Sequence, residues 1–241
     1  MKLKFATIAS SSSGNCVYIG TEYTNILIDA GLSGKKIEEA LKDLELTGQD
    51  IDAVFVTHEH IDHVDGVGVL ARRYNIPIYA TEGTWANMPS KVKAETIRDD
   101  FKRNVYADEN MVFNDLLIRP FDIPHDAAQP VGYSVMTDND KITVATDIGH
   151  ISDTIKENVK GSSILLLESN HDLDMLKNGS YAYNLKQRIL SDYGHLSKEN
   201  NTPRVAFDTV KDIVTDSGVE LGGDFDMWVA APYGVKRRIE L

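Results

Sequence analysis

The chain has 241 residues, of which 42% are hydrophobic and 26% charged, an ordinary globular composition that allows a sizeable core in one domain spanning 1–241. Its formal net charge of −12 excludes general adhesion to nucleic acid or anionic membrane, because that binding needs a basic face. The single cysteine, Cys16, excludes an intramolecular disulfide and agrees with a reducing compartment. Residues 1–10 contain too short an apolar run for a signal peptide or a membrane span, so we expect a cytoplasmic protein that does not contact the membrane.

The first half of the chain reads as a hairpin, a helix and a buried strand. Apolar segments at 16–20 and 25–29 flank the turn-like TEYT, and 34–46 carries apolar residues on one helical face. Residues 53–56, AVFV, are apolar throughout, which is typical of a strand buried on both faces.

The second half repeats this order. Segments 132–136 and 141–147 predict a hairpin, 153–159 a helix, and the apolar run 164–167 a buried strand. A histidine follows the buried strand in each half. Two β-β-α-β halves bury their apolar faces best as two stacked sheets with helices outside. The sequence therefore predicts an α/β fold, a four-layer αββα sandwich.

Residues 57–63 read THEHIDH and follow the first buried strand. His58 and His60 are two positions apart and point the same way in extended chain, while Asp62 and His63 begin the next helix. Nitrogen and oxygen ligands without a thiolate suit zinc, manganese or iron, and favour a catalytic over a structural centre. A solvated, histidine-rich loop is the alternative, and the spacing and strand context argue against it.

Further metal ligands are expected at other strand ends. His125 follows the apolar strand 116–123. Asp147 closes the second hairpin and is the repeat counterpart of Asp29. A carboxylate has two oxygens, so Asp147 is suited to bridge two cations. For either residue the alternative is a surface or hydrogen-bonded side chain, and the strand-end position favours ligation.

The set formed by Asp29, THEHIDH, His125, Asp147 and the histidine of GHLS, His195, resembles the five motifs of the metallo-β-lactamase superfamily. SSSGNCVYIG, LLLESNHD, MLKNGSY, LKQRILSDYGH and HLSKENNTP resemble, more narrowly, the WalJ/YycJ family of bacterial exonucleases. The resemblance implies the metallo-β-lactamase fold, two divalent metal ions and hydrolysis of nucleic-acid phosphodiesters, 5′ to 3′ on single- or double-stranded DNA, with RNA as another possible substrate. The fold alone does not choose the substrate, because several ester and amide classes are cleaved on it.

The resemblance also implies roles for individual residues. One ion would be held by His58, His60, His125 and Asp147, and the other by Asp62, His63, Asp147 and His195. Asp29 would orient a liganding histidine. The two ions would activate a bridging water as hydroxide for in-line attack on phosphorus.

Three residues are expected to take part in catalysis: Asp62, His171 and His195. His171 would contact the scissile phosphate or protonate the leaving oxygen, and a purely structural histidine is its alternative. The context before His195 suggests a leaving-group acid, and the context after it a metal ligand.

Two other functions stay open. One is a thioester or other small-molecule hydrolase of the glyoxalase II type, which would use the same metal site. A groove lined by lysine and arginine, rather than a closed apolar pocket, would argue against it. The other is a non-enzymatic binding module with a degraded metal centre, which the intact set of ligands disfavours.

The stretch 191–203, SDYGHLSKENNTP, departs from the family pattern. Relatives carry two histidine segments here, separated by a helix and a strand, whereas this sequence has one. Loss of a core strand should cost more stability than a domain has to spare. We therefore predict a break in the backbone near Tyr193 to His195, where residues are absent. A continuous backbone would instead mean a remodelled C-terminal region in which His195 serves for both histidines or the second ion is weakly held.

Overall fold

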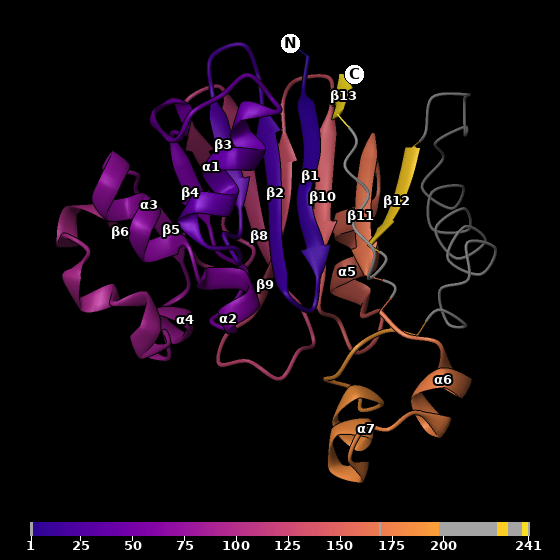
Figure 1. Cartoon of the computed structure of the whole chain (residues 1–241). Coiled ribbons are helices and arrows are strands. Elements are labelled where there is room, and N and C mark those ends of the chain that lie inside the picture. Colours follow the sequence, from indigo (N-terminus) through magenta and orange to yellow (C-terminus); the bar gives the residue numbers. More distant parts are fainter. Residues whose placement is uncertain (1, 169, 198–225, 231–237, 241) are drawn as a thin grey trace.

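The computed structural model describes residues 2–168, 170–197, 226–230 and 238–240, with strand pairing alone for the last two ranges. Within them, two β-sheets lie face to face and helices cover their outer faces (Figure 1). The predicted four-layer αββα sandwich is confirmed. In this part of the chain, every helix is too short or too polar to cross a bilayer.

The first sheet has the strand order β13-β1-β2-β3-β4-β5-β6. Its strands are β1 (Lys4–Ser11), β2 (Gly14–Gly20), β3 (Asn25–Ile28), β4 (Ala53–Phe55), β5 (Ile78–Ala80), β6 (Lys102–Asn104) and β13 (Arg238–Glu240). Its associated helices are α1 (Gly34–Lys42), α2 (Ile61–Val64), α3 (Val67–Tyr74) and α4 (Glu82–Ala86), with 3₁₀ turns at Gly48–Asp50, Ser90–Val92, Ala94–Thr96 and Asp99–Phe101.

Helix α1 ends earlier than the predicted position 46. Glu45 adopts a left-handed conformation with φ of 61°. The Leu46 N–H donates to the Leu41 carbonyl over 2.9 Å. This six-to-one bond is the closing contact of a Schellman motif, so the helix stops although the apolar pattern continues.

The second sheet has the order β12-β11-β10-β9-β8-β7. Its strands are β7 (Met111–Phe113), β8 (Leu116–Asp122), β9 (Val131–Met136), β10 (Lys141–Ala145), β11 (Ile164–Glu168) and β12 (Asp226–Ala230). Helix α5 (Asp153–Val159) covers its outer face. Helices α6 (Leu173–Asn178) and α7 (Tyr183–Ile189) lie beyond the strand ends, below the sandwich in Figure 1.

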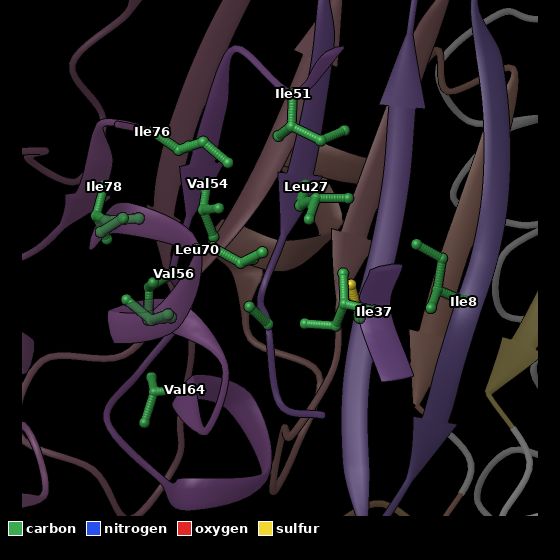
Figure 2. Close-up of a cluster of buried hydrophobic side chains, with 14 of the residues drawn as sticks. Ile8, Leu27, Ile37, Ile51, Val54, Val56, Val64, Leu70, Ile76 and Ile78 are labelled. Carbon is green, nitrogen blue, oxygen red and sulfur yellow. The ribbon is translucent and has the colours of Figure 1, made fainter. Parts of the chain in front are cut away.

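Side-chain alternation along the central strands builds three apolar layers. In β3, Leu27 points toward the helices, in the cluster shown in Figure 2, while Ile26 and Ile28 point toward the other sheet. In β11, Leu166 lies between the sheets and Leu165 faces α5. Burial on both faces explains why these strands read as continuous apolar runs.

The predicted internal repeat is present in the topology. In each half an antiparallel hairpin, β2-β3 or β9-β10, is followed by a helix and then by a strand parallel to the second hairpin strand. Asp29 and Asp147 end the two hairpins in the same left-handed conformation, with φ of 62° and 55°. Strand pairing, counted from these aspartates, places His171 at the position equivalent to His58.

Two hydrogen bonds join the second sheet to the start of the THEH loop. The Tyr133 hydroxyl, on β9, donates to the Val56 carbonyl over 2.7 Å. The Val131 N–H donates to the Thr57 carbonyl over 2.9 Å. Tyr133 is fully buried, so the loop that carries three histidines is fixed from the opposite sheet.

We predict that Tyr133→Phe lowers the free energy of unfolding by about 1–3 kcal/mol, because the buried Val56 carbonyl loses its donor. Urea denaturation measures the change. Tyr23→Phe is the matched control, because Tyr23 is 71% exposed and should shift stability by less than about 0.5 kcal/mol. Equal effects of the two variants would contradict a role for this inter-sheet bond.

Candidate metal centre

The residues predicted from sequence converge at one edge of the sandwich. His58, His60 and His63 follow β4, and His125 and Asp147 follow β8 and β10. Three groups have ligand atoms that all lie within 4.8 Å of one another: His58, His60 and His125; His58, His63 and Asp147; His125, Asp147 and His195. Histidines and a carboxylate at this spacing are able to hold divalent cations.

The first group is three imidazoles whose nitrogens face one another. His60 Nδ1 lies 3.0 Å from His58 Nε2 and 3.2 Å from His125 Nε2. The Nδ1–H of His125 donates to the Gly194 carbonyl over 3.3 Å, and His58 Nδ1 lies 3.0 Å from the Thr57 hydroxyl oxygen. These outer bonds fix the tautomers, so the Nε2 lone pairs of His58 and His125 point into the cluster.

Burial keeps two of these imidazoles neutral. Burial, with the adjacent charge of His63, holds the pKa of His58 well below its usual value. Burial lowers the pKa of His125 to about 4. A neutral imidazole is the form that binds a metal, so both rings are ready ligands at neutral pH.

His63 sits between two carboxylates. Its Nδ1–H donates to Asp29 over 2.7 Å, and its Nε2 lies 2.9 Å from an oxygen of Asp147. Burial opposes protonation, but the charges of Asp147 and Asp29 outweigh it and raise the pKa of His63 well above its usual value. The space between His63 Nε2 and Asp147 is suited to a cation, which would bind the ring in its deprotonated form.

Asp29 is the buried anchor of the THEH loop. Its carboxylate accepts the Thr57 N–H over 2.8 Å and the Thr57 hydroxyl over 2.9 Å, in addition to His63. Although burial raises the pKa of Asp29, these donors favour its charged form. The expected role of orienting a histidine therefore matches its position.

His195 has an equivalent partner that the sequence reasoning missed. The Nδ1–H of His195 donates to Glu168 over 2.6 Å, and the other Glu168 oxygen accepts the Ile148 N–H over 2.7 Å. Burial opposes the charge, but Glu168 and Asp147 raise the pKa of His195 to about 8. A charged residue closing the apolar run ILLLE was the available signal for Glu168.

The glycines after the two repeat aspartates permit close backbone packing. A Cβ on Gly31 would lie 1.6 Å from the Asp62 carbonyl oxygen, and one on Gly149 would lie 2.1 Å from the Asp192 carbonyl oxygen. Both glycines therefore support segments that carry a candidate ligand. The sequence D-x-G thus performs the same packing task in each half.

Asp62 and His171, which were also expected in the site, lie beside the three groups. Among the described residues, Asp62 belongs to none of the three groups, and its carboxylate lies 3.8 Å from His63 Nε2. His171 pairs with Ser197 in a short parallel bridge and lines a cavity next to His195. Asn15, which was not predicted, places its side-chain amide 3.0 Å from His63 Nε2.

The predicted break near Tyr193 to His195 is wrong. The backbone is continuous, and the N–H groups of Gly194 and His195 donate to Ser191 over 2.9 Å and to Ile189 over 3.0 Å. These bonds close the end of α7 and turn the chain directly toward Glu168. A further helix and strand are not needed to deliver His195 to the centre.

A cavity of about 530 Å³ opens beside the centre. Its lining includes Ser11 and Asn15 from the segment around the β1–β2 turn, and Asp147 and His195 from the candidate centre. Residues of α6 and α7 also line it. The cavity is large enough for part of a nucleotide chain or a small-molecule substrate.

Comparison with known proteins gives a consistent assignment. A family model described as a beta-lactamase superfamily domain matches residues 24–209. The chain is 41% identical to a Bacillus anthracis protein named exodeoxyribonuclease YycJ over 216 residues, 90% of this chain and 79% of that protein. It is 37% identical to Streptococcus pneumoniae exodeoxyribonuclease WalJ over 254 residues, 95% of this chain and 94% of that protein.

A solved structure, a diphosphatase of the PhnP family, matches with a TM-score of 0.66 and 17% identity over 100% of this chain and 98% of that one, which shows the shared fold. The pneumococcal alignment has 254 positions, but 95% of this 241-residue chain is about 229 residues, so about 25 positions lack a residue from this chain. The chain belongs to the β-lactamase superfamily and, within it, to the family of the WalJ and YycJ proteins.

Proposed function

We propose that this protein is a metal-dependent nuclease that removes nucleotides from DNA in the 5′ to 3′ direction. The observation that carries the proposal is the match, over nearly the whole chain, to two relatives named exodeoxyribonucleases. The intact His/Asp cluster supports it, because the residues a metal-dependent hydrolase needs are together at one strand edge.

Two divalent ions fit the residues present. His58, His60, His125 and Asp147 would hold one, and His63, Asp147 and His195 the other, with Asp62 beside His63 as a further ligand. Asp147 belongs to two of the three groups, which supports a bridging role. A ligand set dominated by imidazole suits zinc or manganese, with iron also acceptable, better than magnesium.

The protein's own groups prepare this centre. Bound divalent cations would supply Lewis acidity and lower the pKa of a coordinated water. Asp29 and Glu168 hold the Nδ1–H groups of His63 and His195, which leaves Nε2 of each ring for the ion. His171, at the cavity wall, is positioned to contact the phosphate or protonate the leaving oxygen.

Thioester hydrolysis has less support. The expected discriminator, a groove rich in lysine and arginine, is not found: among the described residues that line the cavity, Arg188 is the one lysine or arginine. The preference for a nucleic acid therefore rests on the relatives. A cytoplasmic location also stays a proposal, supported by the lone buried thiol of Cys16.

The test is incubation of metal-loaded protein with end-labelled single- and double-stranded DNA, RNA and a thioester, with products resolved over time. Mononucleotides released from the 5′ end of DNA are expected. Faster cleavage of RNA would revise the substrate. Turnover of the thioester alone would refute the nuclease proposal.

We predict that His60→Ala lowers nuclease activity by more than about 100-fold. Loss of a residue that only orients a ligand costs up to about 100-fold, and His60 is itself expected to bind the ion, because its Nδ1 faces the Nε2 atoms of His58 and His125. His60 is partly exposed, so the fold should persist by circular dichroism. His150→Ala is the matched control, because this exposed histidine lies outside the three groups. More than trace turnover by His60→Ala would contradict the proposed ion site.

Metal removal should abolish activity. After treatment with a chelator, manganese or zinc is expected to restore turnover, whereas magnesium alone is not, because the ligands are mostly imidazole. Activity of the restored protein should rise with pH as a coordinated water loses its proton. Full turnover in excess chelator would exclude this mechanism.

Glu168→Gln should lower the pKa of His195 below its value of about 8, because the stabilising carboxylate is lost. NMR titration of chelated protein measures this pKa. In the metal-loaded protein we expect about 10- to 100-fold weaker metal binding or activity. An unchanged His195 titration would show that Glu168 does not set the state of this ring.

A further inference from the structure

Helices α6 and α7 form an appendage with a composition unlike the rest of the chain. Residues 173–189 contain three cationic side chains, Lys177, Lys186 and Arg188, and one acidic side chain, Asp174, in a chain of net charge −12. Figure 1 shows the two helices outside the sandwich, on the side of the strand ends. A local positive segment next to the candidate metal centre would attract a polyanion that the rest of the surface repels.

The same segment exposes large apolar and aromatic side chains. Tyr181 is 58% exposed, Tyr183 72% and Met175 74%. Within α7, no side chain is buried. Tyr183–Ile189 therefore gains little from packing on the sandwich, and its apolar residues remain available to a ligand.

The cavity connects this surface to the candidate metal centre. Met175, Tyr181, Leu185 and Arg188 line the same cavity as His195. A ligand that reached the ions through this cavity would pass these four side chains. Their aromatic, aliphatic and cationic groups are those that contact bases and phosphates of a nucleic-acid strand.

Arg188 links the appendage to the centre. Its Nε–H donates to Asp126, which neighbours His125, and Asp126 Oδ1 lies 3.4 Å from His125 Nε2. The Arg188 side chain is 53% exposed, so it also faces solvent. An arginine carries five N–H donors, and the bond to Asp126 leaves others for a phosphate.

We propose that the loop and helices from 173 to 189 form the surface that holds single-stranded DNA as it enters the centre, with Tyr181 stacking on a base and Arg188 contacting a phosphate. This inference rests on the proposed nuclease function. A single strand fits better than a duplex, because its bases are free to stack on an aromatic ring. Contacts of this kind tolerate any sequence, as successive cleavage of a strand requires.

The first experiment compares KM for a strand of about 20 thymidylates with KM for an abasic strand of equal length, which has the phosphates but no bases. Tyr181→Ala should raise KM for the thymidylate strand by about tenfold, the effect of one lost stacking contact, and raise KM for the abasic strand far less. Tyr181→Phe should behave as the unchanged protein, because the ring is kept. Tyr23→Ala, at an exposed tyrosine of the β2–β3 turn, is the matched control.

The second experiment addresses Arg188. Arg188→Gln should raise KM for both strands and reduce the dependence of log KM on log salt by about 0.7, the value for one phosphate contact with a single strand. Arg188→Lys should retain most of the salt dependence, because the charge remains. Thermal unfolding of each variant shows whether loss of the Asp126 bond has loosened α7.

Equal KM changes for both strands in Tyr181→Ala, or none, would overturn the stacking role. Conversion of a dimer to a monomer by Tyr181→Ala, seen by light scattering, would instead make this surface an interface between two copies and also overturn the proposal. If the unchanged protein degrades neither DNA nor RNA, the proposed function itself fails, which is a separate outcome.

Discussion

Burial of charge at one strand edge is the constraint on which the rest of the structure depends. Asp29, His63 and Asp147 are all buried, and the charge on each is stabilised by its neighbours. An ionised group removed from water costs several kcal/mol unless it is paired and hydrogen-bonded. The sandwich meets this requirement by fixing the backbone around these groups. The THEH loop is held by hydrogen bonds from the opposite sheet, and the segments that contain Asp62 and Asp192 pack against the two D-x-G turns.

The two halves solve the same problem with different residues. In the first, the carboxylate that holds a histidine Nδ1–H lies at the end of the hairpin, as Asp29. In the second, the hairpin aspartate is Asp147, which faces the centre, and the holding carboxylate comes from the following strand, as Glu168. The two halves therefore share a backbone arrangement but differ in the role of the hairpin aspartate. Asp29 orients a histidine, whereas Asp147 faces the centre as the candidate bridging ligand.

The sequence predicts the strands, the helices and the positions of the ligands better than it predicts the hydrogen-bond partners of those ligands. Apolar periodicity and turn residues are local signals, so the two halves and the strand-end positions of His58, His125 and Asp147 are predicted from them. Glu168 was missed because its partner His195 is distant in sequence, so the charge that closes the apolar strand does not by itself show what it binds. The break near Tyr193 was predicted from the pattern of relatives, whereas backbone hydrogen bonds just after α7 set the path of the chain.

Strand pairing at the sheet edge also affects the order of folding. Strand β1 pairs with β2 on one side and with β13 on the other, where Lys4 lies opposite Glu240. During synthesis the outer edge of β1 cannot pair with β13 until residues 238–240 have left the ribosome. Contacts of such high sequence separation slow folding, and an open strand edge invites pairing with other chains. The nascent chain would therefore expose this edge of β1 to other chains until β13 pairs with it.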